Sequence, residues 1–328
     1  MPESDAQGTL PARHSERRAL RRPAYHRAVD RRLALGFIAA VVVAACSGGG
    51  ASIAPSPPLQ TSAATSSSAA AAATPSPATP TPDVTHPVGI IAIGHSGLTG
   101  EGTGNQYEPR PENSWATGST PAVKSVYLRM IDVLPETEGH VANSAEGGAP
   151  AAALMAQAKI ALVAVPVPAL AIIQTVDNDI QCDGANVAEV GQHLAKALAF
   201  INGASLNTKI MVVGQLGRPS VTFIKELVAA VPATKASLTW DDPCSFFDRD
   251  GKLSVSGVEK LSAVIDKYEA ETARVCAAAS NCVTDGGVRK AWIDKIKYFS
   301  PDYAHLNLDG QAAEAALIWP EVEELLGR

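Results

Sequence analysis

The chain has no excess of basic residues. Its 27 Lys and Arg are outnumbered by 33 Asp and Glu, which gives a formal net charge of −6 at pH 7. Proteins that bind nucleic acid use a basic surplus to neutralise phosphates, so no nucleic-acid partner is expected. The apolar fraction is 46% of 328 residues, which excludes a fully disordered chain and leaves room for a substantial core.

Cysteine is also scarce. The sequence has five, none of them in a CxxC pair, and no His lies at metal-ligand spacing, so we expect no zinc site. Four cysteines form an even set that is typical of two disulfides in an exported protein: Cys182, Cys244, Cys276 and Cys282. The expected pairs are Cys182–Cys244 and Cys276–Cys282, and the other two pairings remain open.

The uncharged run Leu33–Ala45 has thirteen residues, too few to span a bilayer comfortably. Residues 1–45 carry eight Arg and four acids, and small residues precede the break at Cys46. A basic flank, a short apolar core and small residues are typical of an export signal, which is removed from the mature protein. An uncleaved anchor or a plain secretory signal remains an alternative at this point.

The four residues Val43-Ala44-Ala45-Cys46 resemble a bacterial lipobox, in which the cysteine becomes the diacylated N-terminus after cleavage. The resemblance implies a lipid anchor (palmitate or another acyl chain) on Cys46. It also implies a location on the outer face of the bacterial cytoplasmic membrane or in the cell envelope. Arg31-Arg32 leaves open whether export uses a twin-arginine or a general secretory route.

Residues 46–85 have little charge and no apolar periodicity. They are rich in Ala, Ser, Thr and Pro, and Asp83 is their one acidic residue. Such a segment cannot bury enough surface to offset its ordering entropy, so it is expected to be a disordered linker. Residues 86–328 carry a net charge of −9 and are expected to form the folded domain.

This domain alternates predicted strands with predicted helices. Apolar runs predict strands at residues 88–93, 139–143, 169–176 and 209–214. Helical patterns cover residues 122–133, 151–164, 187–202, 219–230, 257–278 and 308–326. The alternation predicts an α/β fold, a three-layer α/β/α sandwich with a mainly parallel sheet. In such sheets ligands bind beyond the carboxyl ends of the strands.

Polar segments stand where these strands end. The turn Gly94–Gly100 (GHSGLTG) can present the hydroxyl of Ser96 at the edge of the sheet. The segment Asn143–Ala149 (NSAEGGA) offers backbone N–H groups ahead of a helix. Asp177-Asn178-Asp179 follows the third strand, and Asp302-x-x-His305 precedes the last helix.

Taken in order, the four segments resemble the blocks of the SGNH/GDSL hydrolase family, which is named for Ser, Gly, Asn and His. The resemblance covers residues 88 to about 319 and implies a flavodoxin-like fold. It implies Ser96 as nucleophile, His305 as base and Asp302 as the acid that orients it. It also implies an oxyanion hole made of the Ser96 and Gly148 N–H groups and the Asn178 amide, with Gly147 as the alternative to Gly148.

The chain departs from the family pattern at two positions. His95 stands before the serine where Asp is usual, and Asp177 stands where Gly is usual. Successive side chains that leave a strand point apart, so we expect His95 to point away from Ser96 and to serve the turn.

The two resemblances thus imply a serine esterase of the cell envelope that hydrolyses an ester or thioester through an acyl-Ser96 intermediate, with no metal and no cofactor. A small-molecule, glycan or lipid ester would be its substrate, and residues 101–119 would line the pocket. Two alternatives stay open: an O-acyltransferase acting on an envelope sugar, and a catalytically silent binding protein with the same fold.

Overall fold

The computed structural model describes residues 86–105, 107–239, 242–292 and 295–328. The predicted signal, the linker and the predicted lipidation site Cys46 lie outside the described residues. Among the helices that the structure does describe, none is both long and apolar enough to cross a membrane.

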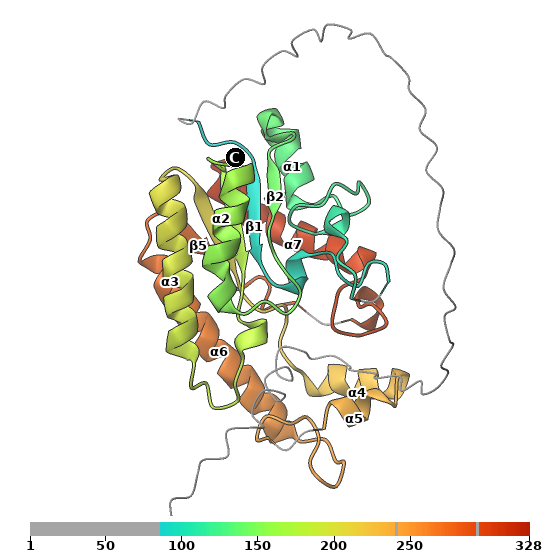
Figure 1. Ribbon diagram of the computed structural model, residues 1–328. Helices are drawn as coiled ribbons and strands as arrows, with labels where there is room; N and C mark the ends of the chain where they lie inside the picture. The colour runs from blue at the N-terminus through green and yellow to red at the C-terminus, as the bar shows by residue number, and fades with distance from the viewer. Residues whose placement is uncertain (1–85, 106, 240–241, 293–294) are drawn as a thin grey trace, which may run out of the picture. The chain divides into compact units, whose positions relative to one another are not determined.

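The described chain folds around a five-stranded sheet (Figure 1). Its strands are β1 (Ile90–Gly94), β2 (Val141–Asn143), β3 (Leu170–Gln174), β4 (Lys209–Val213) and β5 (Cys282–Thr284). Their order is β2-β1-β3-β4-β5, and every neighbouring pair is parallel. Every residue of β1 and β3 is buried, which explains why these strands appear in the sequence as continuous apolar runs.

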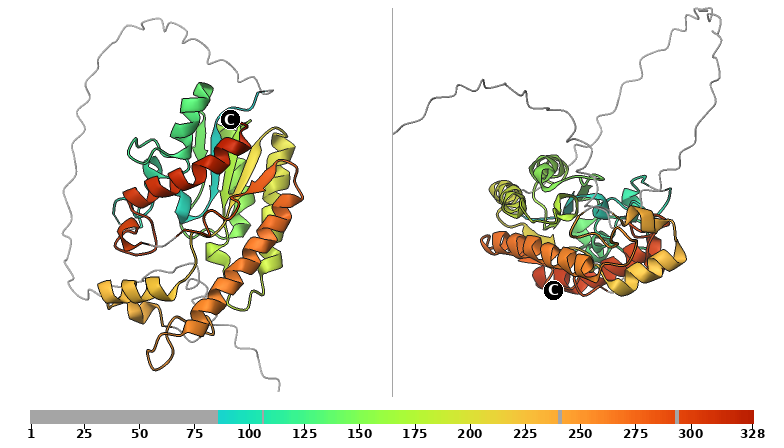
Figure 2. Two further views of the ribbon diagram at one scale, coloured as in Figure 1. Left: turned by 180° about the vertical axis from the view of Figure 1, so that it is seen from behind. Right: turned by 90° about the horizontal axis from the view of Figure 1, so that it is seen from below.

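Helices cover both faces of the sheet. Alternate strand residues such as Ile91 and Ile173 pack with the helices α2 (Leu154–Ala164), α3 (Val187–Ala204) and α6 (Val255–Ala277). Residues of the opposite parity, such as Ile90 and Ile172, pack with α1 (Val126–Val133) and α7 (Leu308–Leu325). Figure 1 shows α2 and α3 in front of the sheet, and the reversed view in Figure 2 brings α7 to the front. The predicted three-layer α/β/α fold is confirmed.

Two further helices lie between β4 and α6. After β4 the chain forms α4 (Val221–Ala230) and the short α5 (Thr234–Ser237) before it reaches α6. The side chain of Ser220 caps α4 by accepting a hydrogen bond from the Phe223 N–H at 3.1 Å. These elements hold the segment after β4, which contributes to one wall of the candidate site.

Both expected disulfides are present. Cys182 is bonded to Cys244 across 62 residues, and Cys276 is bonded to Cys282 across 6. The first bond links the loop after β3 to the segment ahead of α6, and the second links the end of α6 to β5. The pairing that the sequence favoured is therefore confirmed.

Candidate active site

The turn after β1 puts Ser96 at the carboxyl edge of the sheet. Gly94 ends β1 with φ 144°, and an added Cβ there would lie 1.9 Å from the Gln174 carbonyl oxygen. Glycine is therefore required where the chain leaves the strand. The buried Gln157 fixes this point, since its amide accepts from the Gly94 N–H at 2.8 Å and donates to the Gly94 carbonyl at 2.9 Å. Ser96 begins the short helix η1 (Ser96–Leu98) and is 7% exposed.

Asp302 and His305 form a buried pair in the loop ahead of α7. Their side chains are joined between Asp302 Oδ2 and His305 Nδ1 at 2.8 Å. The other carboxylate oxygen accepts from the Ala304 N–H at 2.8 Å, the His305 N–H at 3.0 Å and the Ser300 hydroxyl. Burial by itself would raise the pKa of Asp302, but the hydrogen bonds from His305 and Ser300 outweigh it and lower the pKa to about 2. An ionised carboxylate only accepts, so Nδ1 carries a proton.

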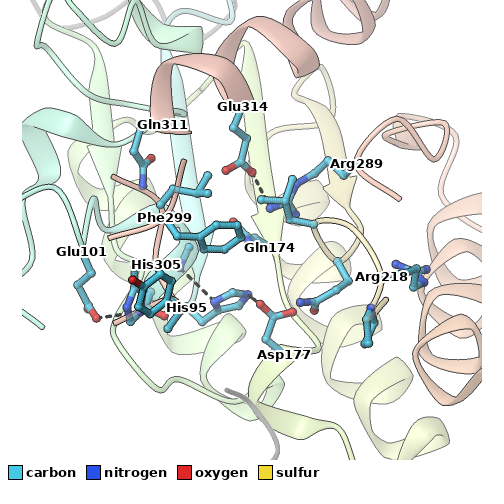
Figure 3. Close-up of a pocket in the computed structure, with 18 of the residues that line it drawn as sticks. His95, Glu101, Gln174, Asp177, Arg218, Arg289, Phe299, His305, Gln311 and Glu314 are labelled. Atoms are coloured by element: carbon cyan, nitrogen blue, oxygen red, sulfur yellow. Dashed lines mark hydrogen bonds and ion pairs between the residues drawn. The ribbon is translucent and has the colours of Figure 1, made fainter. Parts of the chain in front are cut away.

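Ser96 and His305 line the same cavity, which has a volume of about 100 Å³. Figure 3 shows His305 among the residues that line it. The predicted nucleophile and the predicted base come from segments about two hundred residues apart, and the fold brings both to one site. In the structure, His305 Nε2 lies 3.4 Å from Glu101 Oε2. A carboxylate group therefore lies near each ring nitrogen of His305.

Glu101 is a site residue that the sequence did not single out beyond its place in the loop 101–119. It is 6% exposed and accepts a hydrogen bond from the Thr99 hydroxyl at 3.1 Å. An added Cβ on Gly147 would lie 2.5 Å from Glu101 Oε1, so the second sequence block passes directly beside this carboxylate. A single acid in a polar loop gives no periodic signal by which it could have been found.

His95 serves the turn, as expected, because it caps η1 and accepts the Gly97 N–H on Nδ1 at 3.2 Å. It also lines the cavity together with Ser96. Its Nε2 lies 3.1 Å from Asp177 Oδ2, and a neutral ring that accepts at Nδ1 carries its proton on Nε2. The only acceptor nitrogen of His95 is thus in use, which leaves His305 as the better base.

The pKa values of this second pair follow from burial. Desolvation, together with the positive charges of Arg289 and His305, lowers the pKa of His95 to about 3. Desolvation also raises the pKa of Asp177 to about 7, although Arg289 opposes the shift. His95 is therefore a neutral imidazole at neutral pH, and Asp177 holds its proton more tightly than an ordinary carboxyl group.

The lining of the cavity includes one of the three residues that were expected to supply oxyanion donors. Ser96 lines the cavity, whereas Gly148 and Asn178 are not among its described lining residues. Asn178 lies on η5 (Asp177–Asp179), and its side-chain amide donates to the Ala149 carbonyl at 3.1 Å. This bond ties the third sequence block to the second, next to Gly148. Gly148 has φ 73°, a conformation that favours glycine.

The far wall of the cavity carries a buried ion pair that the sequence did not reveal. Arg289, which follows β5, lies 2.5 Å from Glu314 on α7, and each side chain is at most 2% exposed. Arg289 also donates to the Gly214 carbonyl. Burial raises the pKa of Glu314 to about 7, against the effect of Arg289. Figure 3 shows this pair and the His95–Asp177 pair on opposite sides of Gln174.

The described residues offer little to a metal ion. One group of His, Cys, Asp or Glu side chains in the described chain lies within ligand distance, namely Cys182, Asp242 and Cys244. Both cysteines of that group are joined in a disulfide, so their sulfur atoms are not thiolate ligands.

No protein-family model matches this sequence, and no curated protein sequence matches it. Several solved structures are similar to it. The extracellular lipase from Streptomyces rimosus is 16% identical, with 72% of this chain and 99% of the lipase covered and a TM-score of 0.44. The phospholipase A1 from Streptomyces albidoflavus NA297 is 12% identical, with 72% and 99% covered and a TM-score of 0.43. The carbohydrate acetylesterase Est24 from Sinorhizobium meliloti is 14% identical, with 73% and 99% covered and a TM-score of 0.43.

Proposed function

We propose that this chain is a serine ester hydrolase of the SGNH/GDSL type that acts through an acyl-Ser96 intermediate. The observation that carries the proposal is the shared cavity, which is lined by Ser96 and by a His305 held at Nδ1 by Asp302. A serine hydroxyl is a weak nucleophile until a base takes its proton, and a neutral imidazole can do so near neutral pH.

In the first half-reaction, Ser96 Oγ forms a bond to the ester carbonyl carbon while its proton passes to His305 Nε2. The carbonyl electron pair moves onto the oxygen and returns when the bond to the alcohol breaks. The departing alcohol takes the proton from His305 and leaves the acyl group on Ser96. Water then repeats the sequence and releases the acid. Asp302, and Glu101 at 3.4 Å, stabilise the imidazolium that forms in each half.

The transient oxyanion needs donors that are already in place. The Ser96 N–H is the first, and we assign Gly148 N–H and the Asn178 amide as the others. One hydrogen of the Asn178 amide is held by Ala149, so its other hydrogen would serve the oxyanion. Removing one such donor typically costs about 3 kcal/mol of barrier.

A serine-directed fluorophosphonate probe tests the nucleophile. The unmodified chain and a control variant, Ser280→Ala at an exposed serine, should be labelled, whereas Ser96→Ala should not. His305→Ala should be labelled very slowly, and His95→Ala should keep most of its reactivity. Labelling of Ser96→Ala would overturn the assignment of the nucleophile, and an unreactive wild-type chain would support the silent binding protein instead.

The acyl-Ser96 intermediate serves equally well for an O-acyltransferase, because a sugar hydroxyl can replace water in the second half-reaction. The two reactions differ in their product. Hydrolysis releases free acid in the presence of an added sugar acceptor, and transfer converts the acceptor into a new ester. Product analysis by mass spectrometry, with hydrolysis as our expectation, decides between them.

We further propose that the protein is exported and anchored by lipid on Cys46. The lipobox-like segment at residues 43–46 supports this, with residues 46–85 as the tether and residues 86–328 as the enzyme domain. The Cys46→Ala variant should leave the membrane fraction, because the lipid would have no attachment atom. A variant that stays with the membrane would identify residues 33–45 as an uncleaved anchor.

A further inference from the structure

We propose that the polar end of the cavity binds a neutral, hydroxyl-bearing part of the substrate, such as a polyol or a sugar. This polar end is defined by Gln174, Asp177, Gln215, Arg289 and Glu314, which come from or follow four different elements. The inference rests on the proposed ester hydrolase and names the class of ester that it takes.

Buried polar atoms without partners gather at this end. Among the described residues, Gln174 Oε1, Asp177 Oδ1, Gln215 Oε1 and Arg289 Nε are buried and have no hydrogen-bond partner. Leaving one such atom unsatisfied costs roughly 1–3 kcal/mol, so native proteins rarely keep several together. Their residues line one cavity, which indicates that a bound molecule supplies the missing partners.

The chemistry of these groups selects the kind of partner. Two primary amides, a carboxyl group and a guanidinium N–H present both acceptors and donors at close quarters. A hydroxyl group also donates and accepts, so it can satisfy either kind. An alkyl chain can do neither, and a carboxylate or phosphate can only accept.

The charges around the cavity disfavour an anion in a second way. Arg289 is paired with Glu314 at 2.5 Å, and Arg218 is paired with Asp266 at 2.9 Å and with Glu269. Both guanidinium groups of the wall therefore already have carboxyl partners. Glu101 lines the same cavity, and its carboxylate would repel a second negative charge.

The lining of the cavity also has apolar groups. Phe223 and Phe299 line it together with the polar residues, and their ring centroids are 5.3 Å apart. Such a mixed lining suits an ester in which a short acyl group adjoins hydroxyl-bearing carbons.

Gln215→Met is the variant best suited to test the inference. It removes the side-chain amide at nearly constant length and retains the backbone N–H that donates to Glu269 at 2.8 Å. The matched control is Gln192→Met, which makes the same change at an exposed position on α3. Thermal melting of both variants reports whether the fold is kept.

The kinetic test compares glycerol monoacetate with propyl acetate, which has the same carbon chain without the hydroxyls. We expect the wild-type chain and Gln192→Met to prefer the glycerol ester in kcat/KM. Gln215→Met should lose about tenfold on that ester and little on propyl acetate. Equal kcat/KM values for the two esters, or equal losses on both, would overturn the subsite while leaving the hydrolase intact.

A binding measurement separates the subsite from catalysis. Calorimetry with methyl glucoside needs no ester bond, and we expect binding to wild type that is weaker by about tenfold in Gln215→Met. Binding without turnover of either ester would refute the proposed function and keep the subsite. Turnover of propyl acetate with no binding of the glucoside and no preference for the glycerol ester would refute the subsite alone.

Discussion

Replacing Asp302 by Asn tests the catalytic pair and the stability of the fold in one variant. The carboxylate is 1% exposed and accepts from His305, Ser300 and two backbone N–H groups. An Asn would have to place its NH2 group against His305 Nδ1 or against these backbone donors. The first arrangement favours the tautomer with the proton on Nε2, which cannot accept the proton of Ser96.

The activity loss should be large. A wrong tautomer of the base lowers kcat by about 10⁴-fold in the serine-protease triad that serves as the general template. We expect a loss of similar order in Asp302→Asn, measured as kcat/KM on a p-nitrophenyl ester. The control is Asp250→Asn, which makes the same change at an exposed aspartate and should keep full activity.

The stability change follows from the pKa of Asp302. Lowering that pKa from 3.8 to about 2 contributes about 2 kcal/mol to the free energy of unfolding at pH 7. Because the folded-state pKa is the lower one, this contribution is present above pH 4 and is lost as the pH falls toward 2. Denaturant unfolding should therefore show a gap of about 2 kcal/mol between wild type and Asp302→Asn at pH 7, and about half of that at pH 3.

A gap that stays constant between pH 7 and pH 3 would show that the ionised carboxylate is not the source of the stabilisation. Activity within tenfold of wild type in a folded Asp302→Asn variant would refute the assignment of His305 as the base. The two readouts are independent, because the first concerns the charge of Asp302 and the second concerns the proton position on His305.

Two further predictions concern groups around the site. Burial raises the pKa of Asp177 from 3.8 to about 7. Between pH 4 and pH 7 the folded state therefore keeps a proton that the unfolded state loses, so the free energy of unfolding of the wild type should fall as the pH rises. Asp177→Asn cannot ionise, so its melting temperature should rise relative to wild type over that range, and a constant difference in differential scanning calorimetry would contradict this. The disulfides close loops of 62 and 6 residues, which predicts a loss of about 4 kcal/mol when Cys182 and Cys244 are replaced by Ala and about 2 kcal/mol for Cys276 and Cys282. Denaturant unfolding that gave the opposite order would refute the loop-entropy argument.

The sequence predicted the first three crossovers of the fold, from β1 to β4, because they depend on local signals. The strands β1, β3 and β4 are runs of apolar residues bounded by turn residues, and the predicted bounds agree with the structure within two residues. β5 (Cys282–Thr284) is three residues long, carries no periodic pattern and was missed, whereas the equally short β2 was predicted as part of the longer segment 139–143. Its place is set by pairing with β4, which no local pattern encodes.

The site was predictable to the extent that topology brings strand ends together. Ser96 stands at the end of β1, and the Asp302–His305 pair needs a separation of only three residues, so both could be recognised from short segments. The partners of His95 and Arg289 could not be recognised in this way. Asp177 is 82 residues from His95 and Glu314 is 25 residues from Arg289, and a single charge at such a distance has no characteristic spacing.

The sequence of α7 nevertheless carried one signal for the cavity wall that is formed by Arg289 and Glu314. Its buried residues include Gly310, Gln311, Glu314, Ala315, Ile318 and Val322, which recur at helical spacing and form one stripe. Gln311 and Glu314 are polar residues in the middle of that stripe. A buried ion pair such as Arg289–Glu314 often adds no more stability than apolar residues of the same volume, because desolvation offsets the attraction. Gln311 has a structural partner, since its side-chain oxygen accepts from the buried Trp115 N–H at 2.9 Å, whereas core packing does not explain Glu314. A cavity that needs a polar wall does explain Glu314, and a polar residue within the apolar stripe of a predicted helix is the pattern by which such a wall can be recognised from sequence.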